Sequence, residues 1–182
     1  YATLTLDQRD LGVTDPEADL ELFMKGDEPL EHLMVHDALC AAEILRSIPG
    51  IDPDRILYAG ESNGGRTAII ACALDEGSRG VLAISTCGYG VQAAVSSGIL
   101  EDQQQIRFYR SIDPETYLGD LPPRMLVMLH SRNDTVIPYG RAIRTYSLAR
   151  QPRALYAVGC ARHGYCQEMD GYLEEALQEI AS

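Results

Sequence analysis

The stretch "GESNG", residues 60–64, places one hydroxyl-bearing residue, Ser62, between glycines. A serine hydroxyl attacks a carbonyl carbon only when a base removes its proton, so a nucleophilic serine requires a histidine and a carboxylate elsewhere in the chain. The G-x-S-x-G pattern is short enough to arise by chance, and its context decides what it means. A glycine-rich turn whose serine merely caps a helix is the alternative interpretation.

Two predicted elements flank this serine. Residues Arg55 to Ala59 predict a strand, and residues Asn63 to Leu74 predict a helix that is apolar nearly all round. A strand-to-helix bend this tight brings backbone close to the serine, so side chains two residues before or after it would collide, and the hydroxyl stands clear at the strand end. The first amides of the helix are unpaired donors, so we expect the amide of Asn63 to bind an oxyanion.

The candidate acid and base follow two later strands. Asp134 comes just after the strand predicted over Arg124–His130, and His163 comes just after the strand predicted at Leu155–Val158. Catalytic residues of open parallel sheets gather at the carboxyl ends of the strands, so the serine, the aspartate and the histidine are predicted to lie together. The plain alternatives are a turn residue for the aspartate and a surface-loop residue for the histidine.

Strands and helices alternate along the chain, which predicts a mostly parallel sheet with helices on both faces. At 182 residues the chain is long enough for one domain, so we expect a single α/β domain over residues 1–182. The other expected elements are a strand at Thr3–Asp7, a loop over Arg9–Glu28, a helix from Pro29 to about Ser47, a strand at Gly80–Ser85, an irregular and partly helical segment over Cys87–Pro122, and helices at Tyr139–Arg150 and Gln167–Ile180.

Composition excludes several function classes. The net charge is −12, and phosphate binding needs clustered Lys and Arg, so a nucleic-acid partner is not expected. No run approaches the roughly 18 to 20 apolar residues of a membrane span. The four histidines show no zinc spacing, and neither a metal nor a cofactor is expected. The five cysteines are odd in number and are predicted to be free thiols. No signal peptide is visible, and a cytoplasmic location is expected.

Three segments resemble parts of the α/β-hydrolase family. They are "DPDRILYAGESNGGRTAIIACALD", "LHSRNDTVIP" and "ARHGY", which are similar to the nucleophile elbow, the acid loop and the histidine loop of that family. The first, with its "IDPDRI" lead-in, is most similar to prolyl-oligopeptidase-like, acetyl-xylan-esterase-like and dienelactone-hydrolase-like proteins. The resemblance implies a three-layer α/β/α sandwich in which residues 87–122 form a cap-like insertion.

The resemblance also implies a role for each candidate residue. Ser62 would be the nucleophile, His163 the base and then the acid, and Asp134 the group that orients the imidazole. The amide of Asn63 would supply half of the oxyanion hole. The second oxyanion donor of the family follows a central strand that this sequence does not include, so we expect the chain to be part of a longer product.

The leading hypothesis from the sequence is a serine hydrolase that cleaves an ester or thioester of a small-molecule acyl substrate through an acyl-enzyme. A serine peptidase of the prolyl-oligopeptidase type and a non-catalytic hydrolase-fold binding protein are the alternatives. Four aromatic residues are candidates for the wall of an acyl pocket, although aromatic side chains at such spacing more often serve packing. They are Tyr89, Phe108, Tyr109 and Tyr117.

Overall fold

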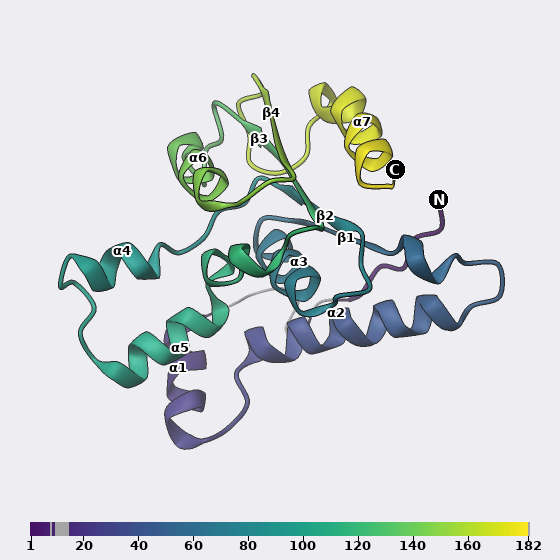
Figure 1. Ribbon diagram of the computed structural model, residues 1–182. Coiled ribbons are helices and arrows are strands. Elements are labelled where there is room, and N and C mark those ends of the chain that lie inside the picture. The colour runs from purple at the N-terminus through teal and green to yellow at the C-terminus, as the bar shows by residue number, and fades with distance from the viewer. Residues whose placement is uncertain (8, 10–14, 182) are drawn as a thin grey trace.

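The computed structural model describes residues 1–7, 9 and 15–181. A parallel sheet with the strand order β1-β2-β3-β4 forms its centre (Figure 1). Because all four strands run the same way, their carboxyl ends meet at one edge of the sheet. The strands are β1 (Leu57–Glu61), β2 (Gly80–Ile84), β3 (Met125–Ser131) and β4 (Arg153–Val158).

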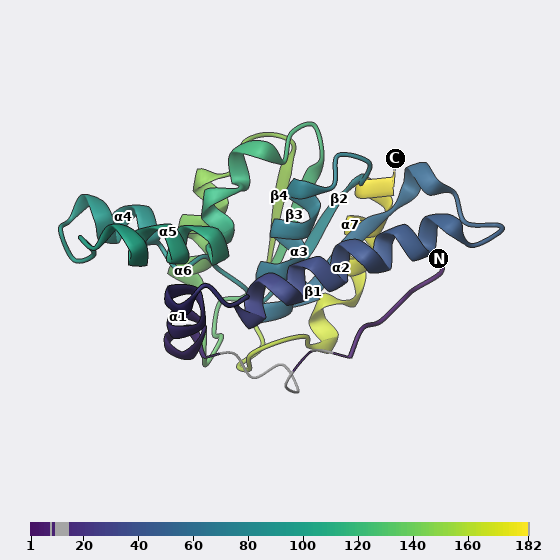
Figure 2. The ribbon, with the colours of Figure 1, turned by 90° about the horizontal axis from the view of Figure 1, so that it is seen from below.

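Helices cover both faces of this sheet, as Figures 1 and 2 show. Alternate residues of each strand face opposite layers, so two separate cores result. One core joins strand residues such as Val81 and Met128 to helices on one face, and the other joins Leu82 and Val127 to a single helix on the opposite face. The first face carries α2 (Leu30–Ser47), α3 (Asn63–Leu74) and α6 (Tyr139–Leu148), and the second carries α7 (Asp170–Ala181). The α/β/α architecture predicted from the alternation of elements is confirmed.

Helix α3 is the most deeply enclosed helix of the site. It packs against β1, β2 and α2, and seven of its twelve residues are buried. The small side chains of its "AIIACA" segment permit this close approach on several sides. The bend at Ser62 is therefore continuous with a helix that is packed in the core.

Residues 87–122 lie outside the sheet and connect β2 to β3. They contain two short helices, α4 (Val91–Ser96) and α5 (Gln103–Ile112), followed by the 3-10 turns η3 (Pro114–Thr116) and η4 (Leu118–Asp120). In both views α4 and α5 project from the body of the molecule (Figures 1 and 2). Phe108 is fully buried against Phe23, with ring centroids 5.5 Å apart, so this candidate for a pocket wall serves packing.

Two expectations for the first 28 residues are wrong. Residues Thr3–Asp7 form no strand, and a strand requires a neighbour that the described residues do not supply along the outer edge of β1. The expected loop over Arg9–Glu28 contains the helix α1 (Pro16–Lys25), while residues 10–14 lie outside the described residues. The signals for α1 were present, since Asp15 caps its start through two backbone amides and Gly26 ends it at φ 84°.

The other predicted elements are confirmed with small shifts of their ends. Strand β1 begins two residues later than expected, because Asp52 caps the 3-10 turn η2 (Pro53–Arg55). The closing helix begins at Asp170, after the 3-10 turn η5 (Gln167–Met169). None of the helices in the described part of the chain is long and apolar enough to cross a membrane.

Candidate active site

The bend at Ser62 has the strained backbone that the glycine pattern predicts. Ser62 has φ 54° and ψ −117°, a conformation that side-chain-bearing residues rarely adopt. A Cβ added to Gly60 would lie 2.2 Å from the carbonyl oxygen of Gly64, and one added to Gly65 would lie 2.8 Å from Cβ of Thr86. Glycine is therefore required at residues 60 and 65 by close approach of other chain segments.

The backbone of the bend is bonded on both sides of Ser62. Its N–H donates to the carbonyl oxygen of Ile84 at 2.8 Å, and its own carbonyl accepts the Thr86 hydroxyl at 2.7 Å. Among the described residues, the structure records no hydrogen-bond acceptor for the backbone N–H of Asn63, the first residue of α3. This donor is available to a ligand, as the helix N-terminus predicts.

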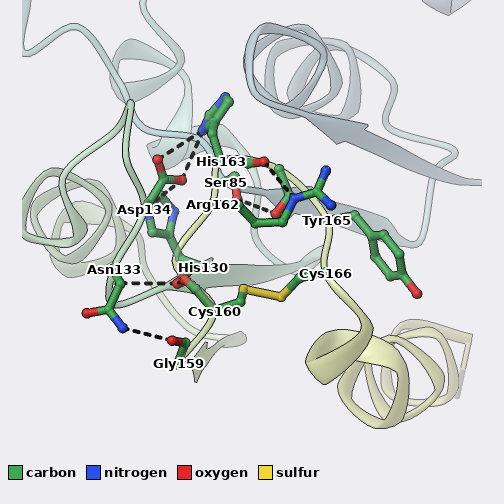
Figure 3. The surroundings of a disulfide bond; sticks show 12 residues. Ser85, His130, Asn133, Asp134, Gly159, Cys160, Arg162, His163, Tyr165 and Cys166 are labelled. Carbon is green, nitrogen blue, oxygen red and sulfur yellow. Dashed lines mark hydrogen bonds and ion pairs between the residues drawn. A yellow bond between two sulfur atoms is a disulfide. The ribbon is translucent and has the colours of Figure 1, made fainter.

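Asp134 and His163 lie side by side at the carboxyl ends of β3 and β4 (Figure 3). Nδ1 of His163 is 2.9 Å from Oδ2 and 3.1 Å from Oδ1 of Asp134. A carboxylate accepts hydrogen bonds, so Nδ1 carries the hydrogen and Nε2 keeps its lone pair. The imidazole is one-fifth exposed, while the carboxylate is fully buried. A buried carboxylate behind a partly exposed ring is the arrangement that a general base requires.

The carboxylate of Asp134 is held ionised by its donors. Burial acts to raise its pKa, but hydrogen bonds from His163 and from the backbone N–H groups of Val136 and Ile137 outweigh burial and lower the pKa below its ordinary value. Both backbone bonds are 2.8 Å long and reach Oδ1. The turn chemistry that was the plain alternative for Asp134 is therefore real, and the same carboxylate also meets the imidazole.

A second histidine stands behind Asp134. His130 is completely buried in the sheet layer, and its Nε2 donates to the carbonyl oxygen of Ile137 at 2.9 Å. Oδ2 of Asp134 is 3.5 Å from the same nitrogen, so the carboxylate lies between the two rings, as Figure 3 shows. Burial lowers the pKa of His130, against the opposing effects of the Ile137 carbonyl and the Asp134 charge. A neutral His130 thus shapes the loop that carries Asp134.

The loop that carries His163 is hydrogen-bonded to the carboxyl ends of two strands, β1 and β2. The backbone N–H of Tyr165 donates to Oε2 of Glu61, the residue before Ser62, at 2.7 Å. The hydroxyl of Ser85, directly after β2, donates to the carbonyl oxygen of Gly164 at 3.2 Å. Ser85 itself has φ 46°, so the ends of β1 and β2 each carry a strained serine.

A disulfide closes the same loop. Cys160 and Cys166 are bonded, and the ring of seven residues that they close contains His163 (Figure 3). The expectation of free thiols is wrong for this pair, whereas Cys40, Cys72 and Cys87 are free. A count of cysteines cannot show that the fold brings two of them together.

Metal-ligand geometry occurs in one place within the described ranges. The sulfur atoms of Cys160 and Cys166 and a carboxylate oxygen of Glu168 lie within 4.8 Å of one another. Both sulfur atoms are consumed by the disulfide, which leaves a single exposed carboxylate. One carboxylate does not make a metal site.

The sequence predicts four site residues, Ser62, Asn63, Asp134 and His163. The structure places all four at the carboxyl edge of one sheet. Among the described residues it records no hydrogen bond between the Ser62 hydroxyl and His163. Such bonds are often long or absent in empty sites and tighten when substrate is bound.

Comparison with known proteins identifies relatives of similar fold. The family model described as acetyl xylan esterase (AXE1) matches residues 27–116. The acetyl xylan esterase from Paenibacillus sp. R4 superposes with a TM-score of 0.70 at 15% identity, covering 98% of this chain and 59% of that one. The acylaminoacyl peptidase of Pyrococcus horikoshii superposes with a TM-score of 0.60 at 19% identity, covering 78% of this chain and 26% of that one.

The chain has the α/β-hydrolase fold. A curated relative, the uncharacterized protein YfhR of Escherichia coli O157:H7, is 29% identical over 163 residues. The alignment covers 81% of this chain and 55% of YfhR, so the chain spans about half the length of that relative.

The sequence did not indicate the residues that hold the histidine loop. Glu61 was visible only as an unspecified position of G-x-S-x-G, and Ser85 only as the end of a strand. The segment "CARHGYC" did carry a signal, because two cysteines stand at equal distances on either side of His163. Such symmetry around a candidate base is a reason to consider a disulfide.

Proposed function

We propose that this chain carries the catalytic centre of a serine hydrolase that cleaves esters through an acyl-enzyme. The observation that carries the proposal is the hydrogen-bonded pair of Asp134 and His163 at the same sheet edge as the strained Ser62. The family model and the acetyl xylan esterases among the structural neighbours favour a short acyl group such as acetyl.

The proposed reaction begins with the transfer of a proton from the Ser62 hydroxyl to Nε2 of His163. The serine oxygen attacks the ester carbonyl, and the resulting oxyanion accepts a hydrogen bond from the Asn63 amide. Asp134 stabilises the imidazolium through its bond to Nδ1. The imidazolium then gives its proton to the departing alkoxide, which leaves an ester between the acyl group and Ser62. Water repeats the sequence, with His163 again as base, and releases the acid.

The test of this proposal uses a fluorophosphonate probe and a p-nitrophenyl ester series from acetate to octanoate. The wild-type protein should be labelled and should turn over the shortest esters fastest. Ser62→Ala should abolish labelling and lower turnover by a factor on the order of 10³ or more. Ser97→Ala, which removes an exposed serine of the projecting segment, should retain both activities.

Two results would overturn the proposal. Labelling that persists in Ser62→Ala would exclude this serine as the nucleophile. A wild-type protein that cleaves acylated peptide p-nitroanilides more efficiently than esters would favour the peptidase alternative, for which the likeness to the acylaminoacyl peptidase is a resemblance of fold.

A further inference from the structure

Glu61 connects the nucleophile bend to the histidine loop. It is the last residue of β1 and stands directly before Ser62. Its Oε2 accepts the backbone N–H of Tyr165 at 2.7 Å, two residues after His163. One side chain thus links the residue before the proposed nucleophile to a residue two positions after the proposed base.

The histidine loop is shaped around this carboxylate. Gly164 has φ +85°, and a Cβ added there would lie 2.4 Å from Oε1 of Glu61 and 2.8 Å from its Cδ. Gly164 is buried although it stands on a surface loop. The carboxylate therefore occupies the space that a side chain at residue 164 would need.

The other contacts of the loop restrain different motions. Asp134 fixes the rotation of the His163 ring, and Ser85 fixes the Gly164 carbonyl relative to β2. Among the hydrogen bonds recorded for the described residues, the bond from Tyr165 to Glu61 is the one that links this loop to β1. Because Ser62 directly follows β1, this bond restrains the distance between the His163 imidazole and the Ser62 hydroxyl.

We propose that Glu61 is a positioning residue that holds His163 at working distance from Ser62. This rests on the function proposed above. A backbone N–H that donates to a carboxylate makes a stronger bond than one that donates to a neutral oxygen. The geometry requires only an acceptor of the right length, so glutamine should replace glutamate and alanine should not.

The first experiment compares Glu61→Ala, Glu61→Gln and Glu168→Ala in the full-length product. Glu61→Ala should lower kcat for p-nitrophenyl acetate and the fluorophosphonate labelling rate about 10- to 100-fold, because small misplacements of catalytic groups have effects of that size. KM should change little, because Glu61 contacts the loop and not the substrate. Glu61→Gln should recover most of the rate. Glu168→Ala removes a nearby exposed carboxylate and should behave as wild type.

A double-mutant cycle with Gly164→Ala tests whether the two residues act through one another. In the wild-type background the added Cβ collides with the Glu61 carboxylate, and kcat should fall sharply. In the Glu61→Ala background the collision is gone, although the cost of a positive φ persists. The effects of the two substitutions should therefore be less than additive. Full additivity of their effects on kcat would contradict the proposal.

Hydrogen exchange at the Tyr165 amide separates the possible failures. Glu61→Ala should speed this exchange, and Glu61→Gln should restore protection. If exchange rises while kcat and labelling hold at wild-type values, Glu61 is only structural and the positioning role is overturned. If both stay unchanged, the bond itself is contradicted. If the wild-type protein shows neither labelling nor turnover, the proposed function fails and the positioning role fails with it, while the exchange data still report whether the bond exists.

Discussion

The nucleophile bend and the histidine loop reach the same edge of the sheet by different means. The bend at Ser62 is shaped largely by residues near it in sequence, because Gly60 must accommodate the backbone of Gly64, while its bonds to Ile84 and Thr86 come from just over 20 positions later. The loop around His163 is shaped by residues far away in sequence, since Glu61 and Ser85 bond its backbone from about 80 to 100 positions earlier.

Substitutions in the bend and in the histidine loop should therefore affect folding and activity differently. A substitution in the bend acts on the packing of a strand against its own following helix, so it should affect folding and activity together. A substitution that releases the histidine loop reaches the cores only through Cys160 and Cys166, so it should affect activity more than folding.

The largest expected effect comes from Gly60→Ala. The added Cβ would lie 2.2 Å from a backbone oxygen, which no change of rotamer can relieve. We expect loss of labelling together with a fall of about 2–4 kcal/mol in the free energy of unfolding, measured by urea titration. Gly171→Ala is the matched control, because its Cβ would meet open space within α7, and there stability should rise by about 0.5–1 kcal/mol. Labelling retained in Gly60→Ala would show that the bend is not locally determined.

Asp134→Asn should lower the activity without unfolding the protein. An asparagine can still accept the Val136 and Ile137 amides but cannot stabilise a charged imidazole at His163. We expect turnover of p-nitrophenyl acetate to fall about 10³- to 10⁴-fold while the protein stays folded by circular dichroism. Turnover within a few-fold of wild type would remove Asp134 from the proposed mechanism.

Cys160→Ser/Cys166→Ser tests the covalent restraint on the histidine loop. A short ring constrains the unfolded chain modestly, so unfolding should become easier by about 2 kcal/mol. Reduction of the wild-type protein by a dithiol should have a similar effect, and turnover should fall less than it does in Glu61→Ala. Cys40→Ser removes a free exposed thiol and serves as the control. Stability that does not respond to either treatment would show that the disulfide adds nothing to the fold.

The smallest expected effect is the contribution of His130 to the pH dependence of folding stability. The pKa of His130 is lowered in the folded state, mainly by burial, so below about pH 6.5 the unfolded chain binds a proton that the folded chain does not. Folding stability should fall as pH decreases from 6.5 to 5.5 by up to about 1 kcal/mol for this residue. His130→Phe should be less stable at neutral pH, because the bond to Ile137 is lost, and should lack this part of the pH dependence. An unchanged slope would assign the titration to another group.

Local signals predicted the elements that surround the site. The helix expected at Asn63–Leu74 has those bounds, because glycines before it and continuous small apolar residues within it leave few alternatives. The segment of helix α1 carries start and stop signals at Asp15, Pro16 and Gly26, but its polar composition predicts a loop. The strand expected at Thr3–Asp7 shows the limit of local pattern, since a strand exists only with a partner.

The sequence by itself determined the bend at Ser62 and the positions of Asp134 and His163 after their strands, because steric limits at a turn and alternation of strands and helices are written locally. Only the tertiary structure decided that Asp134 meets His163, that Glu61 and Ser85 hold the histidine loop, and that Cys160 and Cys166 close it. These contacts join segments distant in sequence, and their partners are selected by the register and packing of the sheet, which no short stretch of residues contains.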